Sequence, residues 1–192
     1  MNSLIKTSLL SLALVSTASM AGNFAGPEAR VSVTMNGATT ALKINNNELT
    51  LGESSLGFKL HGGYGFDVNK DTVVLLGLDY NVTDIAAGKI LGGSLKFKNS
   101  WSLSAAPGML LNDKTLAYVK LSYEAGKLGN STDSEEESIS GVGYGVGLRT
   151  EINKTSFLQT EIKQVNFKKF TSDGADITPS ATVGSVGVVF KF

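Results

Sequence analysis

The 192-residue chain contains no cysteine and a single histidine, His61. Without cysteine it has no disulfide framework, no thiolate metal site and no cysteine nucleophile. A lone histidine is more often a packed or paired side chain than a catalyst, because a triad or metal centre needs partners at defined spacing. We therefore expect no enzymatic activity, no cofactor and no bound metal.

Proline is scarce and neither sign of charge is in excess. The chain has 3 prolines against 22 glycines, and 17 basic residues against 17 acidic ones. Few prolines with many glycines indicate β-structure with close backbone contacts, and the length fits one domain. The balanced charge gives no indication of a nucleic-acid partner.

Long apolar runs are also missing, since no later stretch reaches the about 20 residues that a transmembrane helix requires. The N-terminus instead has the pattern of a secretory signal. Lys6 provides a positive start, an apolar run covers Leu9 to Val15, and the small residues Ser19 and Ala21 follow. We predict a signal peptide over residues 1–21 with cleavage after Ala21, Ala18 being a less favoured site. The mature domain is then 22–192.

Alternation of apolar and polar residues dominates the mature chain. From Leu56 to Phe66 the even positions are largely apolar, while the odd positions carry glycine, Lys59 and His61. A period of two predicts a strand with two unlike faces. Eight segments share this pattern. Their apolar faces begin at Val31, Leu56, Val74, Leu95, Ala117, Val142, Leu158 and Val186.

The connections alternate between two kinds. Residues 68–71, 111–114 and 153–155 are short and carry an Asn-Lys or Asn-Asp step suited to tight turns. Longer polar connections are expected at 37–54, 83–92, 126–138 and 168–180. Short turns at one end and long loops at the other, with an even strand number, are typical of outer-membrane barrels.

Closing the sheet is the physical solution, because unpaired edge amides in lipid cost several kcal/mol each. The sequence therefore predicts an all-β fold, an eight-stranded antiparallel up-and-down transmembrane β-barrel. Its apolar stripes face lipid, and aromatic residues near the strand ends suit interfacial girdles. The interior of eight strands is just wide enough for side chains to fill. The glycine ladder from Gly141 to Gly147 makes room for long side chains there.

Charged residues on the polar stripes should form an interior network, since buried charges must pair. We expect Asp79, Lys96, Lys98 and Glu124 to meet near the outer end of three adjacent strands. A polar plug is the preferred interpretation and a gated path for solutes or protons is the alternative. The predicted network comprises Arg30, Lys59, His61, Asp79, Lys96, Lys98, Lys120, Glu124, Arg149, Glu161 and Lys163.

The last strand, Val186 to Phe192, ends in an aromatic residue and resembles the terminal strand of bacterial outer-membrane proteins. The mature chain resembles small barrels such as the OmpA transmembrane domain, OmpX and the opacity-type "porin family". This resemblance implies location in the bacterial outer membrane among lipids that include lipopolysaccharide. It also implies handling by periplasmic chaperones and by the barrel-assembly machinery, with Phe190 and Phe192 in the recognition signal.

Three functions are compatible with the sequence. The first is a non-enzymatic structural or surface-interaction protein whose loops contact an extracellular ligand or host surface. The second is a narrow, porin-like channel, whose conductance should change when Lys96 or Lys98 is neutralised. The third is a soluble periplasmic ligand-binding barrel, which requires the apolar faces to point inward.

Overall fold

A computed structural model describes residues 24–44, 47–90, 93–130, 136–172 and 175–192. The expected signal peptide and its cleavage site at Ala21 lie outside the described residues. No helix long and apolar enough to cross a membrane occurs among the residues that the structure describes.

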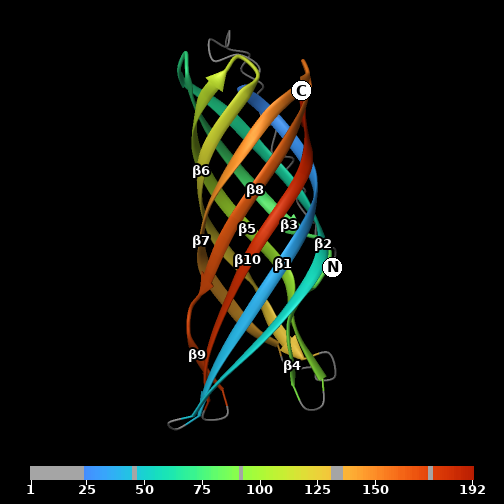
Figure 1. The fold of residues 1–192 in the computed structure, drawn as a ribbon, viewed down its shortest axis with the longest axis vertical. Coiled ribbons are helices and arrows are strands. Elements are labelled where there is room, and N and C mark those ends of the chain that lie inside the picture. Colours follow the sequence, from blue (N-terminus) through green and yellow to red (C-terminus); the bar gives the residue numbers. More distant parts are fainter. Residues whose placement is uncertain (1–23, 45–46, 91–92, 131–135, 173–174) are drawn as a thin grey trace, which may run out of the picture.

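Eight long antiparallel strands form a closed ring (Figure 1). Neighbours pair in the order β1, β2, β3, β5, β6, β7, β8, β10, and β10 pairs back with β1 over sixteen residues, from Glu28↔Lys191 to Lys43↔Asp176. The predicted eight-stranded barrel is therefore confirmed. The strands are β1 (Gly26–Ile44), β2 (Asn47–Asn69), β3 (Thr72–Asn81), β5 (Gly93–Asn112), β6 (Thr115–Asn130), β7 (Glu136–Asn153), β8 (Ser156–Phe167) and β10 (Ala175–Lys191). The short β4 (Ile85–Ile90) pairs with β5, and the short β9 (Phe170–Ser172) pairs with β10.

The three short connections are tight turns that use the same device. In each, an asparagine at the end of the first strand accepts a hydrogen bond from the backbone N–H two residues later. Asn69 Oδ1 accepts from Asp71 at 3.0 Å, Asn112 Oδ1 from Lys114 at 2.9 Å, and Asn153 Oδ1 from Thr155 at 3.0 Å. Such Asx turns reverse the chain within two residues, so the predicted short connections are confirmed.

The four long connections differ from the prediction, because most of their residues belong to strands. The hairpin of β1 and β2 stays paired as far as Ile44↔Asn47, and that of β6 and β7 as far as Gly129↔Glu136. Strands that rise beyond the lipid have water on their outer face and lose the strict apolar-polar alternation. The polar composition of the four long connections is therefore typical of loops, although most of their residues form strands.

The outer surface carries a continuous apolar band. On β5 the outward side chains run from Leu111 to Trp101, which are ten residues apart, and both are exposed. Ten steps of about 3.3 Å, tilted by about 40°, rise about 25 Å, which is the height of the lipid-facing band of transmembrane barrels. Because the apolar stripes point outward, the soluble-barrel alternative, which required them inside, is wrong.

The interior is less uniformly polar than expected, since apolar clusters occupy both ends of the bore. We call them the turn-end cluster and the hairpin-end cluster. The turn-end cluster contains Phe24, Val73, Leu75, Ala106, Leu116, Tyr118, Phe157 and Val189. The hairpin-end cluster contains Ala38, Ile85, Ala87, Phe97, Leu128, Ile139, Val165, Ala181 and Val183. Apolar side chains, among them Phe24, Phe97 and Phe157, therefore fill the bore where no charge does.

A β-bulge in β5 reverses the inside-outside alternation of that strand. Between the pairs Lys98↔Lys127 and Trp101↔Ala125, β5 has one residue more than β6, and Asn99 takes the left-handed conformation with φ of 48°. Phe97 is therefore buried in the hairpin-end cluster although Trp101, at the same parity, is exposed. The predicted interior positions of Lys96 and Lys98 are therefore wrong. The extra residue moves these lysines to the opposite face, and it turns Phe97, which belongs to the apolar face that begins at Leu95, into the interior.

The bulge yields a prediction about Asn99. The Asn99→Gly variant should retain wild-type stability, because glycine adopts positive φ without strain. The Asn99→Val variant should lower the free energy of unfolding by about 1–2 kcal/mol, since a β-branched residue disfavours this conformation. Urea unfolding in lipid vesicles, followed by fluorescence of Trp101, the single tryptophan, measures both. Equal stabilities of the two variants would contradict the assigned backbone strain.

Candidate functional site

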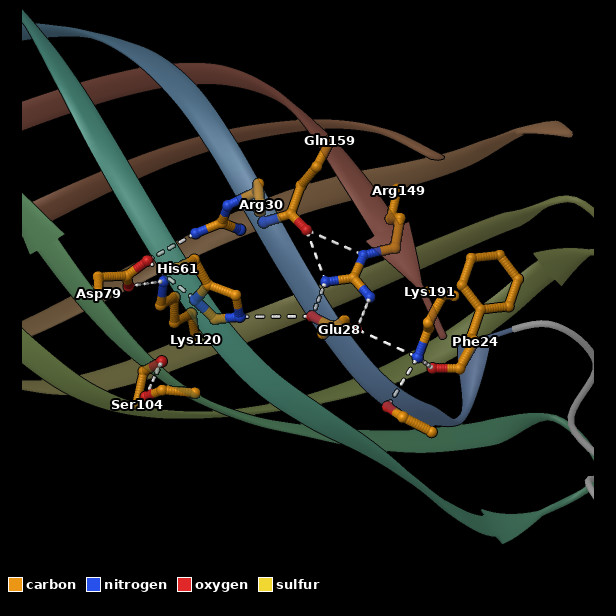
Figure 2. A network of polar contacts seen from close by, with 12 residues as sticks. Phe24, Glu28, Arg30, His61, Asp79, Ser104, Lys120, Arg149, Gln159 and Lys191 are labelled. Atoms are coloured by element: carbon orange, nitrogen blue, oxygen red, sulfur yellow. Dashed lines mark hydrogen bonds and ion pairs between the residues drawn. The ribbon is translucent and has the colours of Figure 1, made fainter. Parts of the chain in front are cut away.

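The charged interior is assembled by strand register. Arg30 on β1 lies opposite His61 on β2, and His61 lies opposite Asp79 on β3. Since all three face the bore, the guanidinium, imidazole and carboxylate meet side by side. Arg30 Nη2 donates to Asp79 Oδ1 at 2.8 Å, and His61 Nδ1 lies 3.0 Å from the same oxygen (Figure 2).

Asp79 is the centre of one group of contacts. Its side chain is 1% exposed, and its second oxygen, Oδ2, accepts from Lys120 Nζ at 3.0 Å and from Ser102 Oγ at 3.3 Å. Lys120 Nζ also donates to Glu161 Oε1 at 3.3 Å, and Tyr118 OH donates to Glu161 Oε2 at 3.0 Å. Charges that are buried in this way are tolerated because each is paired and hydrogen-bonded.

Glu28 is the centre of a second group, closer to the turn end. Arg149 binds its carboxylate with two hydrogen bonds of 2.6 and 2.7 Å, and Lys191 Nζ lies 3.1 Å from Oε2. Gln159 Oε1 accepts from Arg149 Nε at 2.9 Å. Parallel bidentate contacts of this kind are among the strongest polar interactions in proteins.

Glu28 was not predicted as a network residue. It lies two residues before Arg30, so alternation alone places it on the same inner face. The predicted first strand began at Arg30, whereas β1 begins at Gly26. A longer first strand would have placed this carboxylate on the inner face.

His61 joins the two groups. Its Nδ1 faces Asp79 and its Nε2 lies at an ion-pair distance of 3.4 Å from Glu28 Oε1 (Figure 2). Two glycines provide the room for the ring. A Cβ at Gly77 would lie 2.1 Å from His61 Cε1, and one at Gly63 would lie 2.6 Å from Nε2. The imidazole is therefore fixed between two carboxylates by its packing as well as by its polar contacts.

A third group lies toward the hairpin end. Lys163 Nζ donates to Glu124 Oε1 at 2.6 Å, and Ser122 Oγ donates to the same oxygen at 2.6 Å. Gly143 of the glycine ladder borders these side chains, since a Cβ there would lie 2.5 Å from Ser122 Oγ and 3.2 Å from Lys163 Cδ. The predicted residue Lys59 is also buried on the inner face.

Lys96 and Lys98 are not part of this interior. Lys98 Nζ lies 3.3 Å from Glu136 Oε1, and Lys127 Nζ lies 2.9 Å from Glu136 Oε2, at the hairpin end of β5, β6 and β7. Hydrogen bonds from Lys127 and Lys98 lower the pKa of Glu136. The expected meeting of Lys96 and Lys98 with Asp79 and Glu124 is therefore wrong, because the bulge at Asn99 precludes it.

The interior contacts do not have the geometry of a Ser-His-Asp triad. Ser102, His61 and Asp79 come together, but the Ser102 hydroxyl donates to the carboxylate and not to the imidazole. In a Ser-His-Asp triad the serine hydroxyl donates to the imidazole, which acts as its base. No cluster of three or more metal-ligating side chains occurs within the part of the chain that the structure describes.

The family model described as "Outer membrane protein beta-barrel domain" matches residues 7–192. No curated protein matches the chain. Neisserial surface protein A is 14% identical, with 84% of this chain and 97% of that chain covered and a TM-score of 0.50.

Two further solved barrels are similar at lower TM-scores. Ail of Yersinia pestis, in complex with the heparin analogue sucrose octasulfate, is 20% identical, with 85% of this chain and 99% of that chain covered and a TM-score of 0.45. OprG of Pseudomonas aeruginosa is 11% identical, with 91% and 100% covered and a TM-score of 0.47. At these identities, the likeness to solved structures concerns the fold.

The packing around His61 yields a prediction with a matched control. Gly77→Ala should lower the free energy of unfolding by about 1–3 kcal/mol, because the new methyl group displaces the imidazole from Asp79. Gly62→Ala should change it by no more than about 0.5 kcal/mol, since a Cβ there meets nothing within 4 Å. Urea unfolding of both variants in lipid vesicles provides the comparison. Equal effects would show that the fit of the ring does not matter.

Proposed function

We propose that this chain, which belongs to the outer-membrane protein β-barrel family and lies in the bacterial outer membrane, is a non-enzymatic structural and surface-interaction protein with a closed interior. The barrel spans the membrane as a rigid support. Its long hairpins, at the end opposite the short turns, present side chains at the cell surface.

The closed interior is supported by one observation above all. Side chains of β1, β4, β5, β6, β7, β8 and β10 meet in the hairpin-end cluster, and all nine are buried. Beneath this cluster lie the ion pairs of Glu124, Asp79 and Glu28. A hydrated ion would have to lose its water in the apolar cluster and then separate paired charges. The barrel should therefore be a plug rather than a pore.

The hairpin ends provide the surface for interaction. Lys98 and Lys127 share Glu136 there, and Lys169 pairs with Asp176, which also accepts from the Thr171 hydroxyl at 2.9 Å. Hydrogen bonds from Lys169 and Thr171 lower the pKa of Asp176. These pairs are partly or fully exposed to solvent and contribute little to stability. They instead present fixed charges to an extracellular ligand or host surface.

The outer face and the C-terminal strand support two further partners. The apolar band contacts membrane lipids, with lipopolysaccharide in the outer leaflet. Where the band ends on β5 and β6, the rings of Trp101 and Tyr123 are in contact, with centroids 6.0 Å apart. Phe190 and Phe192 are exposed, at 46% and 82%, at the end of β10 and beyond it. We infer that they form the signal that the barrel-assembly machinery recognises after periplasmic chaperones deliver the chain.

Planar-bilayer recording tests the closed interior against the narrow-channel alternative. The purified protein should give no discrete conductance steps in membranes where a porin, reconstituted in the same way, conducts. The reason is the apolar hairpin-end cluster, which an ion cannot cross without losing its hydration. Lys98→Gln should be equally silent, because Lys98 faces outward.

Discrete steps whose size changes in a Lys120→Gln variant would show that ions pass the charged interior. That outcome would replace the structural proposal with a channel. Because Lys98 lies at the hairpin end, the Lys98→Gln variant distinguishes a change of conductance caused by the interior from one caused by charges at the hairpin end.

A further inference from the structure

Lys59 differs from the other buried cations of the barrel. Each of the others reaches a carboxylate: Arg30 and Lys120 contact Asp79, Arg149 and Lys191 contact Glu28, and Lys163 contacts Glu124. The Lys59 side chain is only 3% exposed. Within the described ranges, no hydrogen bond or ion pair reaches its ammonium group.

Lys59 lines a small internal cavity of about 30 Å³. The cavity lies where the charged interior meets the hairpin-end cluster, since Phe97 and Val183 of that cluster line it too. A space of this size holds one small ion or water and excludes organic molecules. Its polar lining consists of Asn36, Lys59, Asn81, Ser100, Glu124 and Lys163.

The charge around the cavity does not balance. Lys163 and Glu124 neutralise each other, and Glu124 is further held by the Ser122 hydroxyl. Lys59 therefore adds one positive charge without a direct partner. An uncompensated buried charge is strongly unfavourable, so a further species should occupy the space.

We propose that this cavity binds a small monovalent inorganic anion of the chloride class, held by the ammonium group of Lys59. The anion completes the pairing of the interior and does not depend on the role of the hairpins. The negative charge of the anion neutralises the ammonium group of Lys59, whereas a water molecule would carry no charge to do so.

Crystallography with bromide as the only halide tests the proposal. The full protein is refolded, purified and crystallised in sodium bromide, so that the enclosed site fills during folding. Data collected at the bromine absorption edge should show an anomalous peak in the cavity, within contact distance of Lys59 Nζ. A cavity that contains no anomalous signal, whether empty or filled by water, would overturn the proposal.

Two variants test the role of Lys59. Lys59→Met removes the unbalanced cation, and Asn36→Asp supplies a fixed carboxylate at the cavity. Both should abolish the bromide peak, whereas Lys127→Met, at the hairpin end, should retain it. A heat-modifiable gel band shows that each variant folds. Should Lys59→Met fail to fold, Asn36→Asp decides, and a peak that persists in either folded variant would contradict the assignment.

Discussion

Two buried carboxylates, Asp79 and Glu28, connect the strands of this barrel through its interior. Asp79 on β3 is contacted by side chains of β1, β2, β5 and β6, and Glu28 on β1 by side chains of β2, β7 and β10. Glu161 and Gln159 add β8 through Lys120 and Arg149. All eight strands of the ring therefore take part in one network, with His61 between its two halves. Such a network favours a single strand register, because a shift by one residue would turn its members toward lipid.

The outer face of the barrel must be apolar, because it contacts lipid. An apolar side chain gains little by leaving one apolar environment for another, so the lipid-facing band cannot by itself select the arrangement of strands. Selection comes from the interior, where buried polar groups must find partners. The bulge at Asn99 satisfies both the need for apolar packing and the need to pair polar groups. Phe97 points into the bore and packs in the hairpin-end cluster, while Lys98 points outward and pairs with Glu136.

Alternation predicted much of this structure, because a period of two records directly which residues face lipid. It placed Arg30, Lys120 and Glu161 on inner faces without knowledge of their partners. The partners themselves depend on the stagger between strands around the ring, as for Glu28 and Arg149, which are 121 residues apart. The extra residue in β5 could not be predicted from the sequence, because Asn99 and Ser100 are compatible with either face of the strand. The hairpin extensions were missed because strands with water on their outer face lack the alternating pattern.

A double-mutant cycle on Glu28 and Arg149 tests most directly whether the interior ion pairs hold the barrel. Unfolding free energies in lipid vesicles are measured for Glu28→Leu, Arg149→Met and the double variant. Each single substitution should cost about 3–5 kcal/mol, because it leaves a charge buried without its main partner. The double variant should cost less than the sum by about 2 kcal/mol or more. Additive or negligible losses would contradict the account.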